Sequence, residues 1–387
     1  MGDKTKIEWT DATWNPLRGC SRISDGCRNC YAETVAHRFS GPGMPYEGLT
    51  RIVNGRPTWT GEIRLVPELL DQPLRWTRPR RIFVNSMSDL FHDGVPDDFL
   101  PYVFSVMAVA KRHVFQILTK RPERMRKVMN DYAFFDTVSC FAKQGHGVEI
   151  TADDWPLPNV WLGVSVENQA TADERIPLLL DTPAAVRWVS AEPLLSEIDV
   201  SRWLDPAGIE CMDVCPSDRF VNQAEAECVV ANGDIRPLCP YCGQAATWTG
   251  HDGGIDWVVA GGESGSHARP SHPDWLRAMR DQCKAAGVPF LFKQWGEWST
   301  AASVASTRAP IFRRFETFEQ WIDKASTWVR GGICLDASGR RCEVGHDFVR
   351  ARDEKAFPVT VMHRVGKRAA GRLLDGVLHD AWPAPRP

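Results

Sequence analysis

Three cysteines lie within eleven residues near the start of the sequence. Cys20, Cys27 and Cys30 are separated by six and then by two residues, and no secretory signal precedes them. Three thiolates leave the fourth corner of a cubane iron–sulfur cluster without a protein ligand, so that one iron is open to a small chelating molecule. A structural zinc site normally has four protein ligands. The spacing therefore predicts a 4Fe–4S cluster held by these three cysteines.

Zinc is the main alternative at the same cysteines. A zinc ion there would need a fourth ligand, and His37 or His92 are the candidates that the sequence offers. A set of reduced or buried thiols without any metal is a further interpretation. The residues alone leave these alternatives open.

The bulk composition is that of an ordinary globular protein. The chain has 387 residues, a formal net charge of −3, 43% hydrophobic and 25% charged residues. It has no run of eighteen apolar residues and no apolar export segment at its start, so neither a transmembrane helix nor secretion is expected. Twelve cysteines in such a chain favour metal ligands over disulfides. The expected compartment is a reducing cytoplasm.

Short apolar runs rich in β-branched and aromatic residues alternate with helical patterns. The expected strands cover 82–86, 113–118, 160–166, 186–190, 255–260 and 289–293, and the expected helices 97–111, 170–180 and 273–286. Apolar strands separated by helices imply a parallel sheet covered on both faces. The predicted fold is α/β: a partial parallel βα barrel of about six βα units, with a small cysteine-rich insertion and a C-terminal α+β extension.

Polar or glycine residues follow every expected strand. Since the carboxyl ends of parallel strands form one rim, side chains at these ends should converge. Helix capping explains some of them, but not the recurrence of charged residues at equivalent places. The predicted catalytic residues are Glu167, Glu192, Glu263 and Lys293. The glutamates would bind hydroxyls or amines or transfer protons, and Lys293 would pair with one of them or with a phosphate. A purely structural Lys–Glu pair is the alternative.

Residues 205–254 interrupt the alternation with a second group of cysteines. The predicted zinc ligands are Cys211, Cys215, Cys239 and Cys242, with Cys228 or His251 as substitutes. The segment has too few apolar residues for a core of its own, so a metal would hold it together. Free thiols are the alternative. The predicted organisation is therefore 1–204 and 255–298 for the two parts of the barrel, 205–254 for the zinc-ribbon-like insertion, and 299–387 for an extension with a hairpin at 333–343 and a basic helix at 364–372.

Three local clusters of basic residues stand out from the mildly acidic average. They comprise Arg75, Arg78, Arg80 and Arg81; Lys120, Arg121, Arg124, Arg126 and Lys127; and Arg364, Lys367, Arg368 and Arg372. A basic stripe can follow a phosphate backbone even on a protein without net positive charge. The residues predicted to contact nucleic acid are Lys120, Arg121, Arg124, Lys367 and Arg368, with solvated surface charges as the alternative. Trp14 and Tyr31 could stack on a base or on adenine, although such aromatics also occur as core residues.

Several motifs of the chain resemble one family. They are KIEWT (6–10), TWNP (13–16), GC (19–20), the segment from GC (26–27) to YAE (31–33), GGESG (261–265), FKQWG (292–296), and RVGK (364–367) continuing to AAGRLLDG (369–376). The chain resembles a phage- and actinobacteria-associated family of uncharacterised proteins with a three-cysteine motif, grouped with radical S-adenosylmethionine (radical-SAM) proteins. The usual cysteine spacing of the radical-SAM superfamily is three and then two residues, whereas the first spacing here is six.

The resemblance implies a partial βα barrel with the cluster at its mouth. It also implies S-adenosylmethionine (SAM) chelated at the open iron and cleaved reductively to a 5′-deoxyadenosyl radical. The superfamily holds the methionine amine with a segment after its second strand, and the matching residues here are Asn85, Ser88 and Asp89. The leading hypothesis is thus a radical-SAM-type enzyme that acts on nucleic acid or a nucleotide, in DNA repair or base modification, with an electron donor as partner. The alternatives are a non-enzymatic iron–sulfur protein that binds nucleic acid or senses redox state, and a zinc-only protein.

Overall fold

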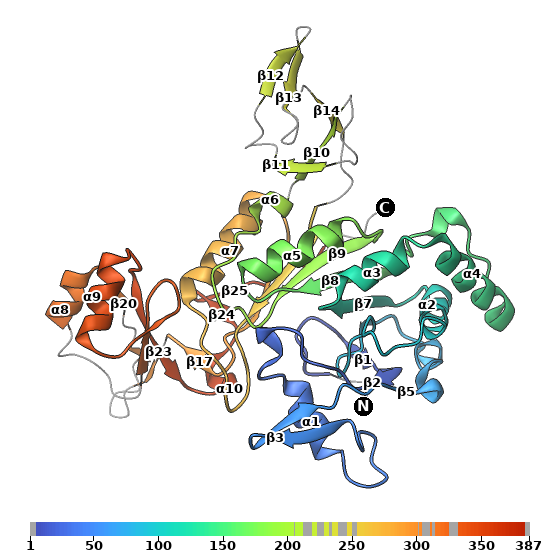
Figure 1. Cartoon of the computed structure of the whole chain (residues 1–387), viewed down its shortest axis with the longest axis horizontal. Helices are drawn as coiled ribbons and strands as arrows, with labels where there is room; N and C mark the ends of the chain where they lie inside the picture. Colours follow the sequence, from blue (N-terminus) through green and yellow to red (C-terminus); the bar gives the residue numbers. More distant parts are fainter. Residues whose placement is uncertain are drawn as a thin grey trace.

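The centre of the molecule is a parallel sheet of seven strands that curls into a half barrel (Figure 1). The structure, a computed structural model, describes residues 5–204, 254–300, 314–324 and 332–383. Between these ranges it describes mainly the backbone of short strands. In spatial order the strands are β1 (Ala12–Trp14), β6 (Arg81–Val84), β7 (Val114–Thr119), β8 (Val160–Ser165), β9 (Val186–Ala191), β15 (Trp257–Gly261) and β16 (Phe290–Gln294). All six expected strands are present, and β1 adds a seventh at one edge. The fold prediction is confirmed as a mixed α/β protein whose sheet is consistent with a partial βα barrel.

Helices cover the convex face of the sheet. The expected helices occur as α2 (Phe99–Val109), α5 (Gln169–Leu180) and α7 (Pro273–Ala285), together with α3 (Pro122–Met129) and α4 (Tyr132–His146). The strand residues that face these helices, such as Val84 and Ile117, are fully buried in the largest hydrophobic core. The helix α5 begins where the Asn168 side chain accepts a hydrogen bond from the Thr171 amide. Capping and apolar burial thus explain where this layer forms.

Tryptophans fill the amino-terminal part of the concave face. Trp9, Trp161, Trp188 and Trp257 form a second core there, because alternate residues of each strand point to the same face. Gly163 of β8 lies against this core, and a Cβ atom at its position would approach the Trp188 indole to 2.5 Å. The C-terminal segment closes this end of the half barrel, since Trp382 stacks on Trp257 with 4.8 Å between the ring centroids.

The segments that surround the cysteines form a small subassembly next to β1 and β6. They include β2 (Leu17–Arg18), which pairs with β5 (Arg64–Leu65), the hairpin β3 (Thr50–Val53) and β4 (Arg56–Trp59), and the helix α1 (Tyr31–Arg38). Three short 3₁₀ helices, at Asp25–Cys27, Pro67–Leu69 and Pro73–Arg75, connect these pieces. In Figure 1, α1 and β3 lie below the sheet.

The chain leaves the sheet between β9 and β15, which pair directly with one another. After α6 (Ser201–Leu204) the strands β10 (Pro206–Cys211), β11 (Arg219–Asn222), β12 (Cys228–Ala231), β13 (Asp234–Pro237) and β14 (Ala246–Thr249) form two small antiparallel sheets (Figure 1). The side chains of the predicted zinc ligands Cys211, Cys215, Cys239 and Cys242 lie outside the described residues. Zinc in this insertion therefore stays a prediction.

A second, antiparallel sheet follows the half barrel. It contains β17 (Trp298–Ser299), β20 (Arg314–Phe315), β21 (Gly332–Leu335), β22 (Arg341–Cys342) and β23 (Val359–Arg364), with α8 (Phe318–Lys324) and α9 (Gly345–Asp353). Further along are α10 (Lys367–Ala370), β24 (Leu373–Leu374) and β25 (Val377–Leu378), and the backbone of β18 (Ala302–Ser303) pairs with β19 (Pro310–Ile311). The expected hairpin is β21–β22, in which Cys334 pairs in register with Cys342 and both thiols are free and buried.

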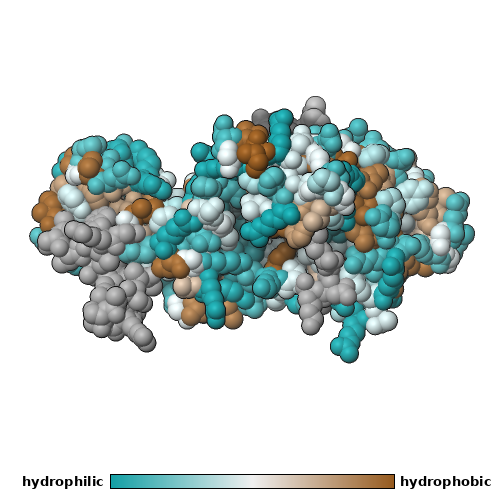
Figure 2. Space-filling view, turned by 90° about the horizontal axis from the view of Figure 1, so that it is seen from below, coloured by the Kyte–Doolittle hydropathy of each residue, from teal (hydrophilic) through white to brown (hydrophobic). Residues whose placement is uncertain are grey.

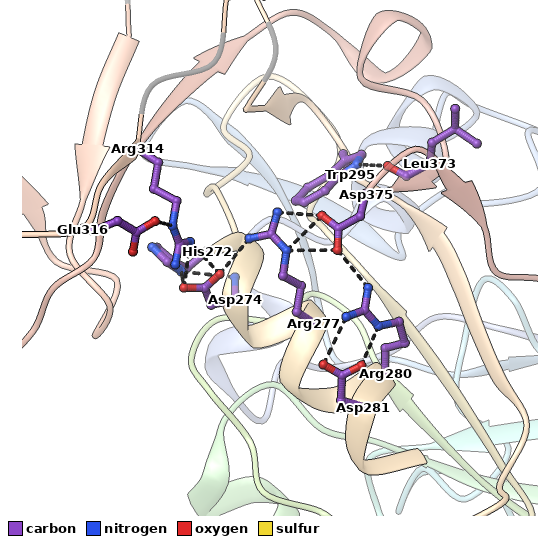
Figure 3. A network of polar contacts seen from close by, with 10 residues as sticks. All are labelled: His272, Asp274, Arg277, Arg280, Asp281, Trp295, Arg314, Glu316, Leu373 and Asp375. Carbon is purple, nitrogen blue, oxygen red and sulfur yellow. Dashed lines mark hydrogen bonds and ion pairs between the residues drawn. The ribbon is translucent and has the colours of Figure 1, made fainter. Parts of the chain in front are cut away.

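Ion pairs join this C-terminal region to the half barrel through α7 (Figure 3). Asp274 accepts hydrogen bonds from Arg277 and Arg314, each at 2.7 Å. Asp375 accepts from Arg277 at 2.6 Å and from Arg280 at 2.8 Å. Residues from β20, α7 and the segment between β24 and β25 therefore meet in one network. Among the described residues no helix is long and apolar enough to span a membrane.

Candidate functional site

The three cysteines lie in one loop between β2 and α1, at the carboxyl-end rim of the half barrel. Gly19 begins this thiol loop (residues 19–30) and forms a bridge with Ser88 in the segment after β6. Its φ of +95° and the 2.1 Å that would separate a Cβ atom from the Glu62 carbonyl oxygen both require glycine. Cys27 ends a short 3₁₀ helix and Cys30 is the N-cap residue of α1.

The thiols of the loop are close enough to affect one another. The pKa of the Cys20 thiol is raised to about 12, chiefly by burial; Asp89 and the thiolates of Cys30 and Cys27 contribute to this shift, and Arg121 opposes it. Burial also raises the pKa of Cys30, and the charge of Lys120 opposes that shift. Cationic side chains near the thiols would offset the charge of a bound anionic group. No three His, Cys, Asp or Glu side chains in the described ranges are arranged to hold a single metal ion.

Asp89 anchors the first part of the thiol loop. Its Oδ1 accepts from the Thr119 hydroxyl at 2.7 Å, and its Oδ2 from Arg121 at 2.9 Å. The same Arg121 guanidinium donates to the carbonyl oxygen of Ser21 at 3.2 Å and to the Ser21 hydroxyl at 2.8 Å. This ion pair is buried, with about 8% of each side chain exposed. A carboxylate after β6 thus fixes the residue next to Cys20 through an arginine after β7.

Glu167 anchors the middle of the loop. The Gly26 amide donates to Glu167 Oε1 at 3.2 Å, and Arg175 of α5 donates to Oε2 at 3.1 Å. Glu167 is fully buried, and its partner Arg175 is nearly so. A Cβ atom at Gly26 would lie 3.0 Å from the Glu167 carboxyl carbon, so the loop approaches the carboxylate very closely. Glu167 therefore positions the residue directly before Cys27.

Glu263 anchors the end of the loop. Asn29 donates to Glu263 Oε2 at 3.0 Å, and Arg269 donates to Oε1 at 2.7 Å. Arg269 also donates to the carbonyl oxygen of Asp25 at 2.9 Å. Three buried carboxylates, each from a different strand end, therefore hold the thiol loop: Asp89, Glu167 and Glu263.

A fourth buried carboxylate holds the loop from the opposite side. Glu33 of α1 accepts from Arg22 at 2.9 and 2.5 Å and from the Trp59 amide at 3.0 Å. Arg22 follows Cys20 by two residues, so this pair connects the loop to both α1 and β4. The arrangement leaves the loop little freedom to change its shape.

Glu192 and Lys293 form a pair on the concave face. Lys293 donates to Glu192 Oε2 at 3.1 Å, and the Ser190 hydroxyl donates to the same oxygen at 3.3 Å. Both charged side chains are partly accessible, with 13% and 18% exposed for Glu192 and Lys293. Trp188 and Ser190 of β9 and Glu192 directly after it are alternate residues, which places the pair on the carboxyl side of the tryptophan core. Of the four predicted catalytic residues, these two retain accessible polar atoms.

Asn85 is the buried polar residue of the rim that lacks a partner among the described residues. Its side chain is 2% exposed, and neither its amide nitrogen nor its amide oxygen bonds to a described residue. Its φ of +60° is a left-handed conformation, which costs energy in a residue other than glycine. A buried amide without a partner is unfavourable by itself, so Asn85 is suited to bind a polar ligand.

The other predicted cofactor-binding residues differ in what they can still bind. Both Asp89 oxygens are fully used, and the Ser88 hydroxyl donates to the Leu17 carbonyl oxygen at 3.1 Å. The stacking role predicted for Trp14 is wrong: Trp14 is fully buried in the helix-covered core and donates to the Leu69 carbonyl oxygen at 2.7 Å. Tyr31 remains suited to stacking because 51% of it is exposed.

Of the two histidines considered as zinc ligands, His92 has both ring nitrogens in hydrogen bonds and His37 has one. His92 Nδ1 accepts from the Gly94 amide at 3.0 Å, so its Nε2 donates to the Ser21 hydroxyl 2.8 Å away. His37 Nδ1 lies 3.1 Å from the Thr50 hydroxyl. Burial lowers the pKa of His92, which keeps the ring neutral in this role.

The residues predicted to contact nucleic acid do not form one free cationic stripe. Arg121 is buried against Asp89, and Arg124 donates to the His92 and Val95 carbonyl oxygens and to Asp97. Lys367 lies 3.7 Å from Glu8. Lys120 is half-buried near Cys30, and Arg368 is exposed. The nucleic-acid role of this set stays a prediction.

Sequence reasoning missed the residues that complete the anchoring. Arg22, Glu33, Asn29 and Arg269 were not singled out because none belongs to a periodic pattern or a metal-binding spacing. Their partners are distant in sequence: 234 residues separate Asn29 from Glu263. The one available signal was the recurrence of glutamates after strands, which identified Glu263.

The family comparison covers almost the whole chain. The family model described as "Protein of unknown function (DUF5131)" matches residues 4–383. No curated protein and no solved structure matches the chain significantly. The match includes the thiol loop, all seven strands of the half barrel and the C-terminal sheet. The chain therefore belongs to the DUF5131 family of proteins of unknown function.

Proposed function

We propose that the protein is an iron–sulfur enzyme in which Cys20, Cys27 and Cys30 hold a 4Fe–4S cluster with one iron open to a small ligand. The observation that carries the proposal is the anchoring of the thiol loop by buried carboxylates. Buried ion pairs add little net stability, so several of them around one loop are best explained by the need to hold its thiols in one arrangement. When bound, such a cluster supplies an open iron and one-electron chemistry.

The donor set fits a cluster better than a zinc ion. The loop contributes three thiols, and the other cysteines with described side chains lie in α4, in α7 and in the C-terminal hairpin. A zinc ion would need a fourth ligand, whereas both ring nitrogens of His92 are hydrogen-bonded and no three ligating side chains of the described residues, His37 included, are arranged around one ion. Lys120 and Arg121 lie near the thiols and would offset the negative charge of a thiolate-bound cluster.

The ligand that we propose for the open iron is SAM, as the resemblance to radical-SAM proteins implies. Asn85 would donate to and accept from its polar groups, since neither amide atom bonds to a described residue. Glu192 would bind an amine or hydroxyl through Oε1, because Lys293 and Ser190 occupy only Oε2. The exposed ring of Tyr31 would stack on the adenine.

An enzyme accounts for these side chains better than a purely structural or redox-sensing cluster protein. A cluster without a substrate would need the anchored loop but not the buried Asn85 amide, which bonds to no described residue, or the accessible Glu192–Lys293 pair. The proposed substrate is a nucleotide, free or within nucleic acid. An electron donor would be the remaining partner.

Cleavage of SAM tests the proposal. Protein reconstituted anaerobically with iron and sulfide should release 5′-deoxyadenosine from SAM after reduction by dithionite, as measured by liquid chromatography and mass spectrometry. Cys27→Ser should release none. Cys140→Ser is the matched control, because Cys140 is an exposed thiol of α4 outside the loop. Wild-type protein that carries the cluster but leaves SAM intact would contradict the enzymatic role.

A further inference from the structure

A pocket of about 500 Å³ opens directly beside Cys30 and Tyr31. Three segments form its walls: the thiol loop with α1, the turn between β3 and β4, and residues 264–267 after β15. Asn29 joins these walls, because it donates to the His267 carbonyl oxygen at 2.9 Å and accepts from Arg56 at 3.4 Å. The pocket is thus a built feature of the thiol-loop region, of a size that suits a ligand such as a nucleotide.

Positive charge dominates the lining of this pocket. Arg22, Arg28, Arg38 and Arg56 all line it, and Glu33 is the one carboxylate among its described lining residues. Both Glu33 oxygens are occupied, by Arg22 and by the Trp59 amide. Arg28, Arg38 and Arg56 form no ion pair with any residue in the described ranges. The nearby Glu263 is neutralised by Arg269.

Three guanidinium groups around one concavity, without a carboxylate partner in the described part of the chain, repel one another and attract an anion. Arginine forks match the oxygens of a phosphate, to which they donate two parallel hydrogen bonds. The face that carries α1 and β3 is the one seen in Figure 2, where hydrophilic residues predominate and hydrophobic ones are scattered. A ligand that complements the arginines of this pocket would be polar and anionic.

We propose that this pocket binds the phosphate of a nucleotide through Arg28, Arg38 and Arg56. Tyr31 lies between the pocket and the rim, since it lines the pocket and donates through its hydroxyl to the Ser86 carbonyl oxygen at 2.6 Å. A nucleotide held here by its phosphate would have its base or sugar next to the thiol loop. The inference rests on the proposed function only for the assignment of this nucleotide as the substrate. The phosphate belongs either to a free nucleotide or to a nucleic-acid strand.

Binding measurements on the full chain test the pocket. The ligands are a nucleoside 5′-monophosphate, the matching nucleoside, inorganic phosphate, and a short fluorescein-labelled single-stranded oligonucleotide, studied by calorimetry or fluorescence anisotropy. The double variant Arg38→Gln/Arg56→Gln should weaken binding of the phosphate-bearing nucleotides roughly tenfold or more, since each arginine donates charge-assisted hydrogen bonds. Arg51→Gln is the matched control, because Arg51 is exposed on β3 but does not line the pocket.

The outcomes separate the sources of the phosphate. Weaker binding of the monophosphate shows that the pocket takes a free nucleotide, and weaker binding of the oligonucleotide shows that it takes a strand. Either result, or both together, supports the pocket. For the strand, the slope of log K against log salt should become shallower by about 0.7 for each phosphate that the variant no longer neutralises. Equal affinities of the wild type and the double variant for both ligands would overturn the proposal, as would tighter binding of inorganic phosphate than of either.

Iron and sulfide content, measured on the same preparations, separates this inference from the proposed function. The double variant should carry as much cluster as the wild type, because among the described residues the one bond from these two arginines to the thiol loop is that of Arg56 to Asn29 Oδ1 at 3.4 Å, and the Asn29 nitrogen keeps its own bond to Glu263. A loaded cluster without arginine-dependent phosphate binding would reject the pocket alone. Arginine-dependent binding by protein that never takes up iron would reject the cluster alone.

Discussion

Individual side chains at the rim either position the thiol loop or remain available to bind a ligand, and their hydrogen bonds distinguish the two roles. Glu167 accepts from the thiol loop and from α5 at once, and no part of it is exposed. It is a positioning residue. Asn85 has the opposite character, because it is buried in a left-handed conformation and its amide bonds to no described residue. A side chain kept under such unfavourable conditions is expected to bind a ligand.

Glu167→Gln should weaken both the fold and the cluster site. The glutamine keeps an acceptor for the Gly26 amide but leaves the buried Arg175 without its counter-charge, which typically costs about 3–5 kcal/mol. We expect a lower free energy of unfolding in urea and reduced iron content after reconstitution. Glu174→Gln is the control, since Glu174 is exposed on the same helix. Unchanged stability would mean that Arg175 does not depend on this carboxylate.

Asn85→Gly should separate stability from ligand binding. Glycine adopts a φ of +60° without strain and removes an amide that bonds to no described residue, so the free energy of unfolding should stay the same or rise. Affinity for SAM, measured by calorimetry on reconstituted protein, should fall about tenfold if the amide makes one or two hydrogen bonds to the ligand. Wild-type affinity in this variant would exclude Asn85 from the ligand site.

At the scale of elements, the half barrel and α7 determine where the functional side chains lie. Strands β8, β9 and β16 place alternate residues on the concave face. Tryptophans or a leucine come first along these strands. Polar residues follow at the carboxyl ends, among them Glu192 and Lys293. Gly163 lets Trp188 cross β8 at close range. The helix α7 holds the C-terminal region through Asp274 and Arg277, while its N-cap residue His272 is fully buried (Figure 3).

Gly163→Ala should destabilise the concave core. Its added Cβ would approach the Trp188 indole to 2.5 Å, and neither the strand backbone nor the packed ring can move freely. Overpacking of this kind costs about 1–3 kcal/mol, which urea unfolding would detect. Gly145→Ala serves as control, because a Cβ there meets nothing within 4 Å. The control should be as stable as the wild type or more so, because alanine favours the helix α4. Wild-type stability of Gly163→Ala would show that Trp188 can repack.

Acid should weaken the attachment at α7 through His272. Burial lowers the pKa of His272 from 6.5 to about 4. The unfolded chain takes up this proton near pH 6.5 and the folded chain only near pH 4, so the free energy of unfolding should fall as the pH drops through this range. His272→Asn keeps an N-cap acceptor and should flatten the dependence. A variant with the wild-type pH profile would assign the acid sensitivity to other groups.

For the whole molecule, the sequence predicted the frame better than the site. Buried parallel strands are apolar over their full length and alternate with helices, so their pattern is local and readable, and all six expected strands were found. The contacts that hold the thiol loop are not local: 141 residues separate Gly26 from Glu167. Charge type alone could not distinguish the anchoring Glu167 and Glu263 from the accessible Glu192. Nor could it reveal that Trp14 belongs to the core or that Arg28, Arg38 and Arg56 surround one pocket.

Metal and sulfide analysis of anaerobically purified protein tests the central claim most directly. We predict about four iron and four sulfide per chain for a single cubane, with a brown colour and an absorption band that dithionite bleaches. Cys20→Ser, Cys27→Ser and Cys30→Ser should each lose most of this iron, and Cys140→Ser should retain it. Zinc in place of iron at these three cysteines, or iron that persists in all three variants, would contradict the account.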